Sequence, residues 1–239
     1  MNAPANRTRQ SGMSMIEVLV TMIILLVGLL GLAGLMMQSQ RSEVGSYERV
    51  QALVIMQDMV GRINANRNIA ATAQTAAIPP YCYAFTTNLT SGTPYVGTTG
   101  TGVLNLPVPS PGCAVGTAAE IAQFQKDLQD WNNELLGTTE QFYSTPAASA
   151  VNFGAMINAR GCVSYDATTE LHNYTNGAAI PGSGLYTVAV AWQGAGDSFA
   201  PPVSNTIPAM NCATGLYGPE TRRRIVAMSF RIGAINNLL

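Results

Sequence analysis

The stretch "GMSMIEVLVTMIILLVGLLGLAGLMM", residues 12–37, decides the fold of this 239-residue chain. From Val18 to Met37 it carries no charged residue, and only Thr21 has a side chain that forms hydrogen bonds. As an α-helix, this apolar run would be about 30 Å long, which matches the hydrocarbon core of a bilayer. The sequence therefore predicts a membrane-spanning helix.

The run is too long for a cleaved secretory signal, whose apolar core has about 7–15 residues. The segment "GLAGLMMQSQ" also lacks a clear A-x-A cleavage site. Arg7 and Arg9 precede the run without an acidic neighbour, a pattern that places the N-terminus on the cytoplasmic side of a membrane. We therefore expect a single pass through a bacterial inner membrane, with the body that follows in the periplasm.

Glu17 does not fit an ordinary membrane anchor. An ionised carboxylate costs about 2.5–3.5 kcal/mol at the centre of a membrane helix, and less near the interface. Two interpretations remain open at this point. The carboxylate either lies at the interface without a role, or it gains a partner that the sequence alone does not display.

The segment "GMSMIEVLV" resembles the prepilin motif of type IV pilins, in which a prepilin peptidase cuts after the glycine and methylates the new N-terminus. The resemblance implies cleavage between Gly12 and Met13, where the family usually has Phe in place of Met13. It also implies that Glu17 of an incoming subunit pairs with a neighbour's N-terminal amine during filament assembly. Two buried opposite charges are tolerable together, whereas each is costly alone.

The helix is expected to continue beyond the membrane, because residues 38–68 are rich in helix formers and contain no proline. The predicted helix runs from about Ser14 to Asn66. Its second half is expected to be amphipathic and to pack on the body. The apolar residues predicted for the packing face are Val50, Leu53, Val54, Val60 and Ile63.

The segment "YERVQALVIMQDMVGRINANR", residues 47–67, resembles the region that follows the anchor in the PilV family of minor pilins. The pieces "AEIAQFQKDLQDWNNEL" and "YTVAVAWQG" resemble a helix and a strand of that family. The resemblance implies a role in type IV pilus assembly and priming, and so in twitching motility, adhesion or DNA uptake. It also implies the partners: prepilin peptidase, other minor pilins, the major pilin, the inner membrane before assembly, and a tip adhesin.

The predicted fold class is α+β, a type IV pilin-like fold in which the long N-terminal helix packs on an antiparallel β-sheet. The expected organisation is a leader over 1–12, a membrane and assembly helix over 13–37, its amphipathic continuation over 38–66, and a periplasmic body over 67–239. In the body we predict a helix over 118–136 and strands over 161–165, 185–193 and 223–232.

Acidic and basic clusters in the body are predicted to be solvated. Asp127, Asp130 and Glu134 are expected on the outer side of the 118–136 helix, where a metal site would need further oxygen ligands. The basic triplet 222–224 is expected at a solvated strand entry. With a net charge of −1, the chain gives no bulk argument for DNA binding.

Four cysteines are expected to form two disulfides if the body is exported. They are Cys82, Cys113, Cys162 and Cys212. Four cysteines allow three pairings, and we favour Cys82–Cys113 with Cys162–Cys212 because both are local. Buried free thiols remain the alternative. No two of these cysteines form a C-x-x-C pair and the only histidine is His172, so a zinc site is not expected.

No constellation typical of an enzyme occurs in the sequence, and we expect no catalytic residue, cofactor or small-molecule substrate. The segment "GTTGTG", residues 97–102, has the wrong spacing for a dinucleotide fingerprint. Two alternatives to a minor pilin stay open: a pseudopilin of a type II secretion system, and a membrane-anchored periplasmic hydrolase or binding domain. The last alternative predicts an uncleaved N-terminus.

Overall fold

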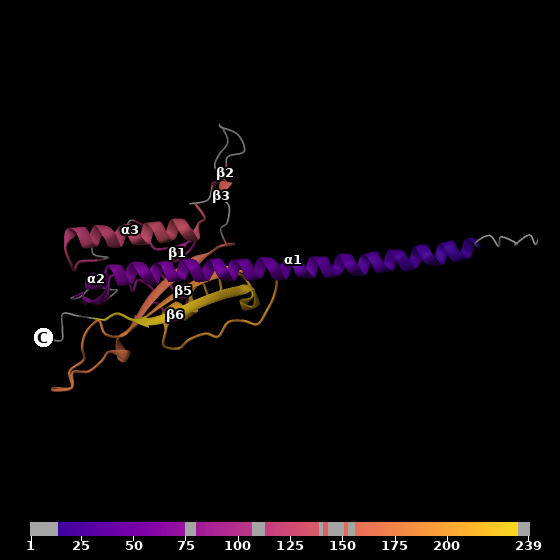
Figure 1. The fold of residues 1–239 in the computed structure, drawn as a ribbon. Coiled ribbons are helices and arrows are strands. Elements are labelled where there is room, and N and C mark those ends of the chain that lie inside the picture. The colour runs from indigo at the N-terminus through magenta and orange to yellow at the C-terminus, as the bar shows by residue number, and fades with distance from the viewer. Residues whose placement is uncertain are drawn as a thin grey trace, which may run out of the picture. The chain divides into compact units, whose positions relative to one another are not determined.

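The computed structural model describes residues 14–74, 80–106, 113–138, 141–142, 151–152 and 156–233. The chain divides into two compact units, Met1–Val44 and Gly45–Leu239. Helix α1 (Met15–Ala65) runs through the boundary between them. Figure 1 shows the order of the elements along the chain. The predicted long helix is therefore confirmed, with ends within one residue of those expected from the sequence.

The C-terminal part of α1 belongs to the second unit and buries one stripe of side chains. The buried apolar residues of this stripe are Ala52, Ile55, Met56, Met59 and Ile63. The predicted packing face was therefore wrong in part, because Val50 and Val54 are 60% and 61% exposed. Apolar residues lie on nearly every side of this segment, so their spacing alone did not select the stripe that meets the sheet.

The main sheet has four antiparallel strands in the order β1-β4-β5-β6. These strands are β1 (Val96–Gly97), β4 (Arg160–Asp166), β5 (Leu185–Gln193) and β6 (Arg223–Arg231). In register, Val163 of β4 lies opposite Val188 of β5, which lies opposite Met228 of β6. The α+β fold class and the three predicted strands are confirmed, whereas the two-residue β1 was not predicted.

Helix α3 (Ala118–Leu135) begins with a capping box. Thr117 accepts a hydrogen bond from the N–H of Glu120, and the Glu120 carboxylate accepts one from the N–H of Thr117. The helix buries Phe124, Leu128, Trp131 and Leu135, as its apolar spacing predicts.

The remaining elements are short. They are the helix α2 (Arg67–Ala71), the 3-10 turns η1 (Ala167–Thr169), η2 (Pro208–Asn211) and η3 (Glu220–Arg222), and the paired strands β2 (Gln141–Phe142) and β3 (Val151–Asn152).

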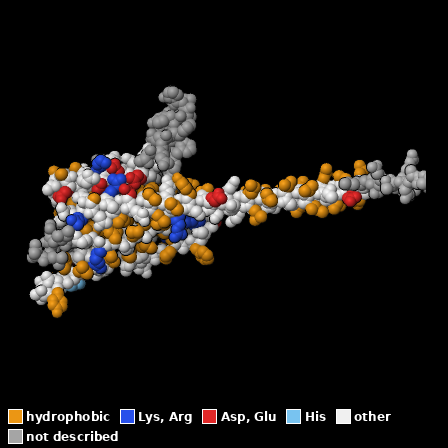
Figure 2. All heavy atoms as spheres, in the orientation of Figure 1, with side chains coloured by type: hydrophobic (Ala, Val, Ile, Leu, Met, Phe, Trp, Pro, Cys, Tyr) orange, Lys and Arg blue, Asp and Glu red, His pale blue; other side chains and the backbone are white. Residues whose placement is uncertain are grey.

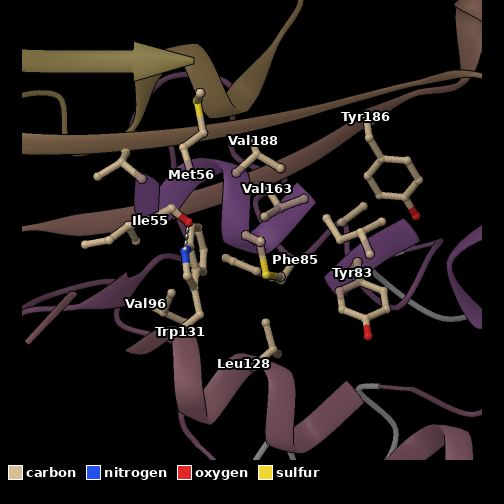
Figure 3. Close-up of a cluster of buried hydrophobic side chains, with 14 of the residues drawn as sticks. Ile55, Met56, Tyr83, Phe85, Val96, Leu128, Trp131, Val163, Tyr186 and Val188 are labelled. Carbon is tan, nitrogen blue, oxygen red and sulfur yellow. Dashed lines mark hydrogen bonds between the residues drawn. The ribbon is translucent and has the colours of Figure 1, made fainter. Parts of the chain in front are cut away.

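The main core lies between the sheet and the two helices α1 and α3, as Figure 3 shows. Trp131 is fully buried there, and its indole Nε1 donates a hydrogen bond to the carbonyl oxygen of Ile55, at 2.9 Å. The ring packs directly over Gly161 of β4, where an added Cβ would lie 2.4 Å from it. A glycine is therefore required at this point of the strand for α3 to approach the sheet.

Two disulfides are formed, and they are the pairs that locality favoured. Cys82–Cys113 has an S–S distance of 2.08 Å, and Cys162–Cys212 one of 2.00 Å. Cys162 belongs to a second cluster of buried residues, which contains Ala189 and Ala191 of β5. Because neighbouring residues of a strand point to opposite faces, this cluster lies on the face of the sheet away from Val163 and the main core.

The expectation of a solvated strand entry is confirmed for Arg222, which is exposed, and is wrong for Arg223. Arg223 is fully buried, and its Nε donates to Glu220 at 2.5 Å. Arg224 donates from Nη1 to the carbonyl oxygen of Thr221, at 2.7 Å. Arg222 ends η3 and pairs with Asp197. The three arginines are neighbours in the sequence, but each of them therefore binds its own acceptors in the loops before β6.

Candidate processing and assembly site

The expected cleavage site, Gly12 and Met13, lies outside the described residues, which begin at Ser14. Glu17 lies in the first turn of α1. Its backbone N–H donates to the carbonyl oxygen of Ser14 at 2.9 Å, and its side chain is exposed. A carboxylate in the first turn of a helix is stabilised by the unpaired N–H groups there. The fold therefore leaves the Glu17 carboxylate open to an external partner.

The apolar residues that follow Glu17 are all exposed within the first unit. The large ones are Val18, Leu19, Val20, Met22, Ile23, Ile24, Leu25, Leu26, Val27, Leu29, Leu30, Leu32, Leu35, Met36, Met37 and Val44. Figure 2 shows such side chains along the visible face of this part of α1. An 18-residue window of α1 has a mean hydropathy of 2.8, so the helix is long and apolar enough to cross a membrane.

Three glycines interrupt this apolar surface at a spacing of three residues. An added Cβ at Gly28, Gly31 or Gly34 would meet nothing within 4 Å. Packing within the described part of the chain therefore does not require a glycine at any of the three positions. Small residues let helices approach closely in a membrane, so these glycines are available to a neighbouring helix.

A second carboxylate of α1, Glu48, has a very different environment. It is 8% exposed and accepts a hydrogen bond from the indole Nε1 of Trp192 at 3.0 Å. This contact joins α1 to β5 within the second unit. Sequence reasoning missed it, although the sequence offered one signal: Glu48 lies four residues before Ala52, the next buried residue of the same stripe.

The last turns of α1 meet α3 through one arginine and several carboxylates. Arg62 donates from Nη2 to Glu134 at 2.8 Å and from Nη1 to Asp130 at 3.2 Å, and it also pairs with Asp58. Burial lowers the pKa of Arg62, but these carboxylates outweigh that effect and raise it above its ordinary value. The expectation of a solvated acidic face on α3 was therefore wrong.

Asp127 is the most buried carboxylate of this region, at 2% exposure. It accepts hydrogen bonds from the Tyr83 hydroxyl at 2.6 Å and from Gln123 at 2.7 Å. Burial, and next the hydrogen bond to Asp127, raise the pKa of Tyr83. The sequence could not reveal this role, because Tyr83 lies in a segment without regular secondary structure.

A groove of about 580 Å³ runs between the end of α1 and the start of α3. Its carboxylates already have partners: Asp127 binds Tyr83, and Glu120 caps α3. Among the residues that the structure describes, no cluster of His, Cys, Asp or Glu can hold a metal ion. The polar groups of the groove therefore join the two helices to the body.

The comparisons with known proteins give one finding. Residues 7–33 match the family model described as the prokaryotic N-terminal methylation motif. Neither a curated protein nor a solved structure matches the chain. The matched residues include Gly12, Met13 and Glu17 and extend into the exposed apolar part of α1. This motif indicates a member of the type IV pilins and pseudopilins, a structural class of membrane-anchored proteins that assemble with other pilins.

Proposed function

We propose that this protein is a minor pilin of the type IV pilus, of the PilV kind, which a prepilin peptidase processes between Gly12 and Met13. Residues 13–37 then span the inner membrane before assembly and form the filament contact afterwards. Residues 38–66 hold this helix to the periplasmic body formed by residues 67–239. The protein acts in pilus assembly and priming together with other minor pilins and the major pilin.

One observation carries the proposal: a lone carboxylate, Glu17, opens an apolar helix whose side chains have no cover in their own unit. Exposed apolar surface of this extent needs lipid or another protein around it. Cleavage after Gly12 would create a new amine at Met13, four residues before Glu17 in the sequence. The amine and the carboxylate of neighbouring subunits can then neutralise one another inside the filament.

In this mechanism Glu17 sets the axial position of the incoming subunit and has no chemical role. An ion pair is strongly position-dependent in an apolar medium, so a shifted subunit would leave both charges unpaired. Gly28, Gly31 and Gly34 permit the close approach of neighbouring helices. The body, whose sheet and disulfides are complete without this helix half, presents the surface that other minor pilins contact.

The test is to replace Glu17 with Ala in the full-length protein and to express it in a strain that lacks the wild-type copy. Loss of co-purification with the other minor pilins and loss of surface pili are expected. The matched control is Glu43→Ala, which removes an exposed carboxylate from the same helix and should leave both properties intact. Normal co-purification and normal piliation of Glu17→Ala would contradict the proposal.

A pseudopilin of a type II secretion system is the second candidate, because the methylation motif fits it equally well. The resemblance of residues 47–67 to the PilV family favours the pilus. Deleting the gene distinguishes the two: loss of pili with normal protein secretion supports the minor pilin, and loss of secretion with normal pili supports the pseudopilin.

A further inference from the structure

Arg160, at the start of β4, is a buried cation without a matching anion. It is 6% exposed, and the ion pairs among the described residues do not include it. Its Nη1 donates to the carbonyl oxygen of Asn158 at 3.2 Å, and its buried Nε has no hydrogen-bond partner. Burial lowers the pKa of Arg160, but Tyr217 and Tyr95 outweigh that effect and raise it above its ordinary value, so the guanidinium stays charged. No carboxylate among the described residues neutralises this charge, which leaves it open to an anion from outside the fold.

Two tyrosines fix the plane of this guanidinium. Its Cζ lies 5.1 Å from the ring centroid of Tyr95 and 5.0 Å from that of Tyr217, within the range of cation–π contacts. Both rings are held by their hydroxyls: Tyr95 donates to the carbonyl oxygen of Thr101 and Tyr217 to that of Asn158, each at 2.8 Å. The guanidinium is therefore oriented before any ligand arrives.

The glycine- and threonine-rich loop 98–102 borders the guanidinium. A Cβ added to Gly100 would lie 3.6 Å from Arg160 Nη2 and 3.1 Å from the Tyr95 hydroxyl oxygen. The backbone N–H groups of residues 99–101 and the exposed hydroxyls of Thr99 and Thr101 donate to none of the described residues. Unpaired N–H groups in a loop are suited to binding an anion.

We infer that Arg160 and loop 98–102 form a binding subsite for a carboxylate. One oriented cation with neutral N–H and hydroxyl donors matches a single negative charge, which a carboxylate carries and a phosphate dianion exceeds. The site lies in the body and does not depend on the processing or assembly of α1. It assigns a ligand class to the "GTTGTG" segment, whose spacing excludes a dinucleotide.

The test uses the full-length protein in a nonionic detergent, with ¹⁵N label in arginine and glycine. Sodium acetate is the probe, and sodium chloride at equal ionic strength is the control. Acetate should shift the resonances of the Arg160 side chain and the Gly100 amide in a saturable way. No saturable shift, or an equal shift with chloride, overturns the inference.

Two variants test the residues of the subsite. Arg160→Gln should weaken acetate binding about ten- to a hundredfold, because it removes a charge-assisted hydrogen bond. Its control is Arg67→Gln, the same change of charge at an exposed arginine. If Arg160→Gln does not fold, Thr101→Val keeps the test valid: it retains the arginine and should weaken binding about two- to tenfold, whereas Thr90→Val should not. Unchanged affinity in Arg160→Gln, or in Thr101→Val where that variant stands in, overturns the subsite.

Further probes identify the source of the carboxylate. An acetylated peptide rich in glutamate that binds more tightly than acetate supports a protein partner with an acidic side chain. Equal affinities for both probes support a free small carboxylate. Inorganic phosphate that binds more tightly than acetate overturns the assignment to a carboxylate.

Discussion

Helix α1 exposes its apolar side chains in one part and buries a stripe of them in the other. Residues 15–44 expose their apolar side chains and begin with a carboxylate, Glu17, that has an open environment. In the second unit, the helix buries one stripe, and its carboxylate Glu48 accepts a hydrogen bond from Trp192. The comparison teaches that the body is a complete fold, whereas the first unit still needs a partner to cover it.

The largest expected effect comes from truncating one apolar side chain in each of the two units and comparing the loss of stability. Trp131→Ala should lower the free energy of unfolding of the body by about 3–5 kcal/mol, because it leaves a cavity beneath α1 and removes the hydrogen bond to Ile55. The matched change in the first unit, Leu26→Ala, alters an exposed side chain and should change this free energy by less than about 0.5 kcal/mol.

Chemical denaturation of the full-length protein in a nonionic detergent measures both values, with tryptophan fluorescence as the signal. A similar loss for Leu26→Ala and Trp131→Ala would show that the first unit also contributes to the stability of the body.

Two carboxylates of α1, the buried Glu48 and the exposed Glu43, provide the next test. Glu48→Ala leaves the buried Trp192 indole without its acceptor and should cost about 1–3 kcal/mol of unfolding free energy. Glu48→Gln retains an acceptor oxygen and should recover most of this loss. Glu43→Ala, at an exposed position, serves as the control in the same denaturation experiment. Equal stability of Glu48→Ala and Glu43→Ala would show that the hydrogen bond between Glu48 and Trp192 does not help to hold α1 on β5.

Alkaline pH should destabilise the body and leave the first unit unaffected. Burial raises the pKa of Tyr217 to about 12, whereas an unfolded tyrosine ionises near pH 10. Between these values the unfolded state releases a proton that the folded state keeps, so stability falls as pH rises, by about 1.4 kcal/mol per pH unit. Residues 15–44 contain no tyrosine.

Denaturation midpoints recorded from pH 9 to 12 check this expectation. The stability of Tyr217→Phe should depend less steeply on pH than that of the wild type. The helical signal of residues 15–44, followed in a peptide of that sequence in micelles, should stay constant. An unchanged slope in Tyr217→Phe would mean that this tyrosine does not contribute to the alkaline sensitivity.

The sequence predicted the elements of the fold well and their contacts less well. The lengths of α1, β4, β5 and β6 follow from uninterrupted periodic segments, which a single sequence displays. The packing face of α1 was wrong because Val50 and Val54 are as apolar as the residues that meet the sheet. The choice between such faces depends on the surface opposite, where Trp131 and Trp192 contact the helix.

The charged residues of the body were the least predictable part. Asp127 and Arg223 have the sequence context of solvated residues, yet both are buried with partners distant along the chain or in a loop. The Tyr83–Asp127 pair joins residues 44 positions apart, so no local pattern encodes it. The N-terminal segment was easier to interpret, because Gly12, Glu17 and the apolar run lie within the residues that match the N-terminal methylation motif.

The most direct test of the central claim is the mass of the N-terminal peptide of the protein isolated from its own membrane. The proposal predicts a chain that begins at Met13 and carries one added methyl group on its α-amine. A Gly12→Arg variant, which changes the residue before the proposed cut, should remain unprocessed and retain Met1. A wild-type chain that still begins at Met1 would contradict the claim that this helix is released for assembly by cleavage.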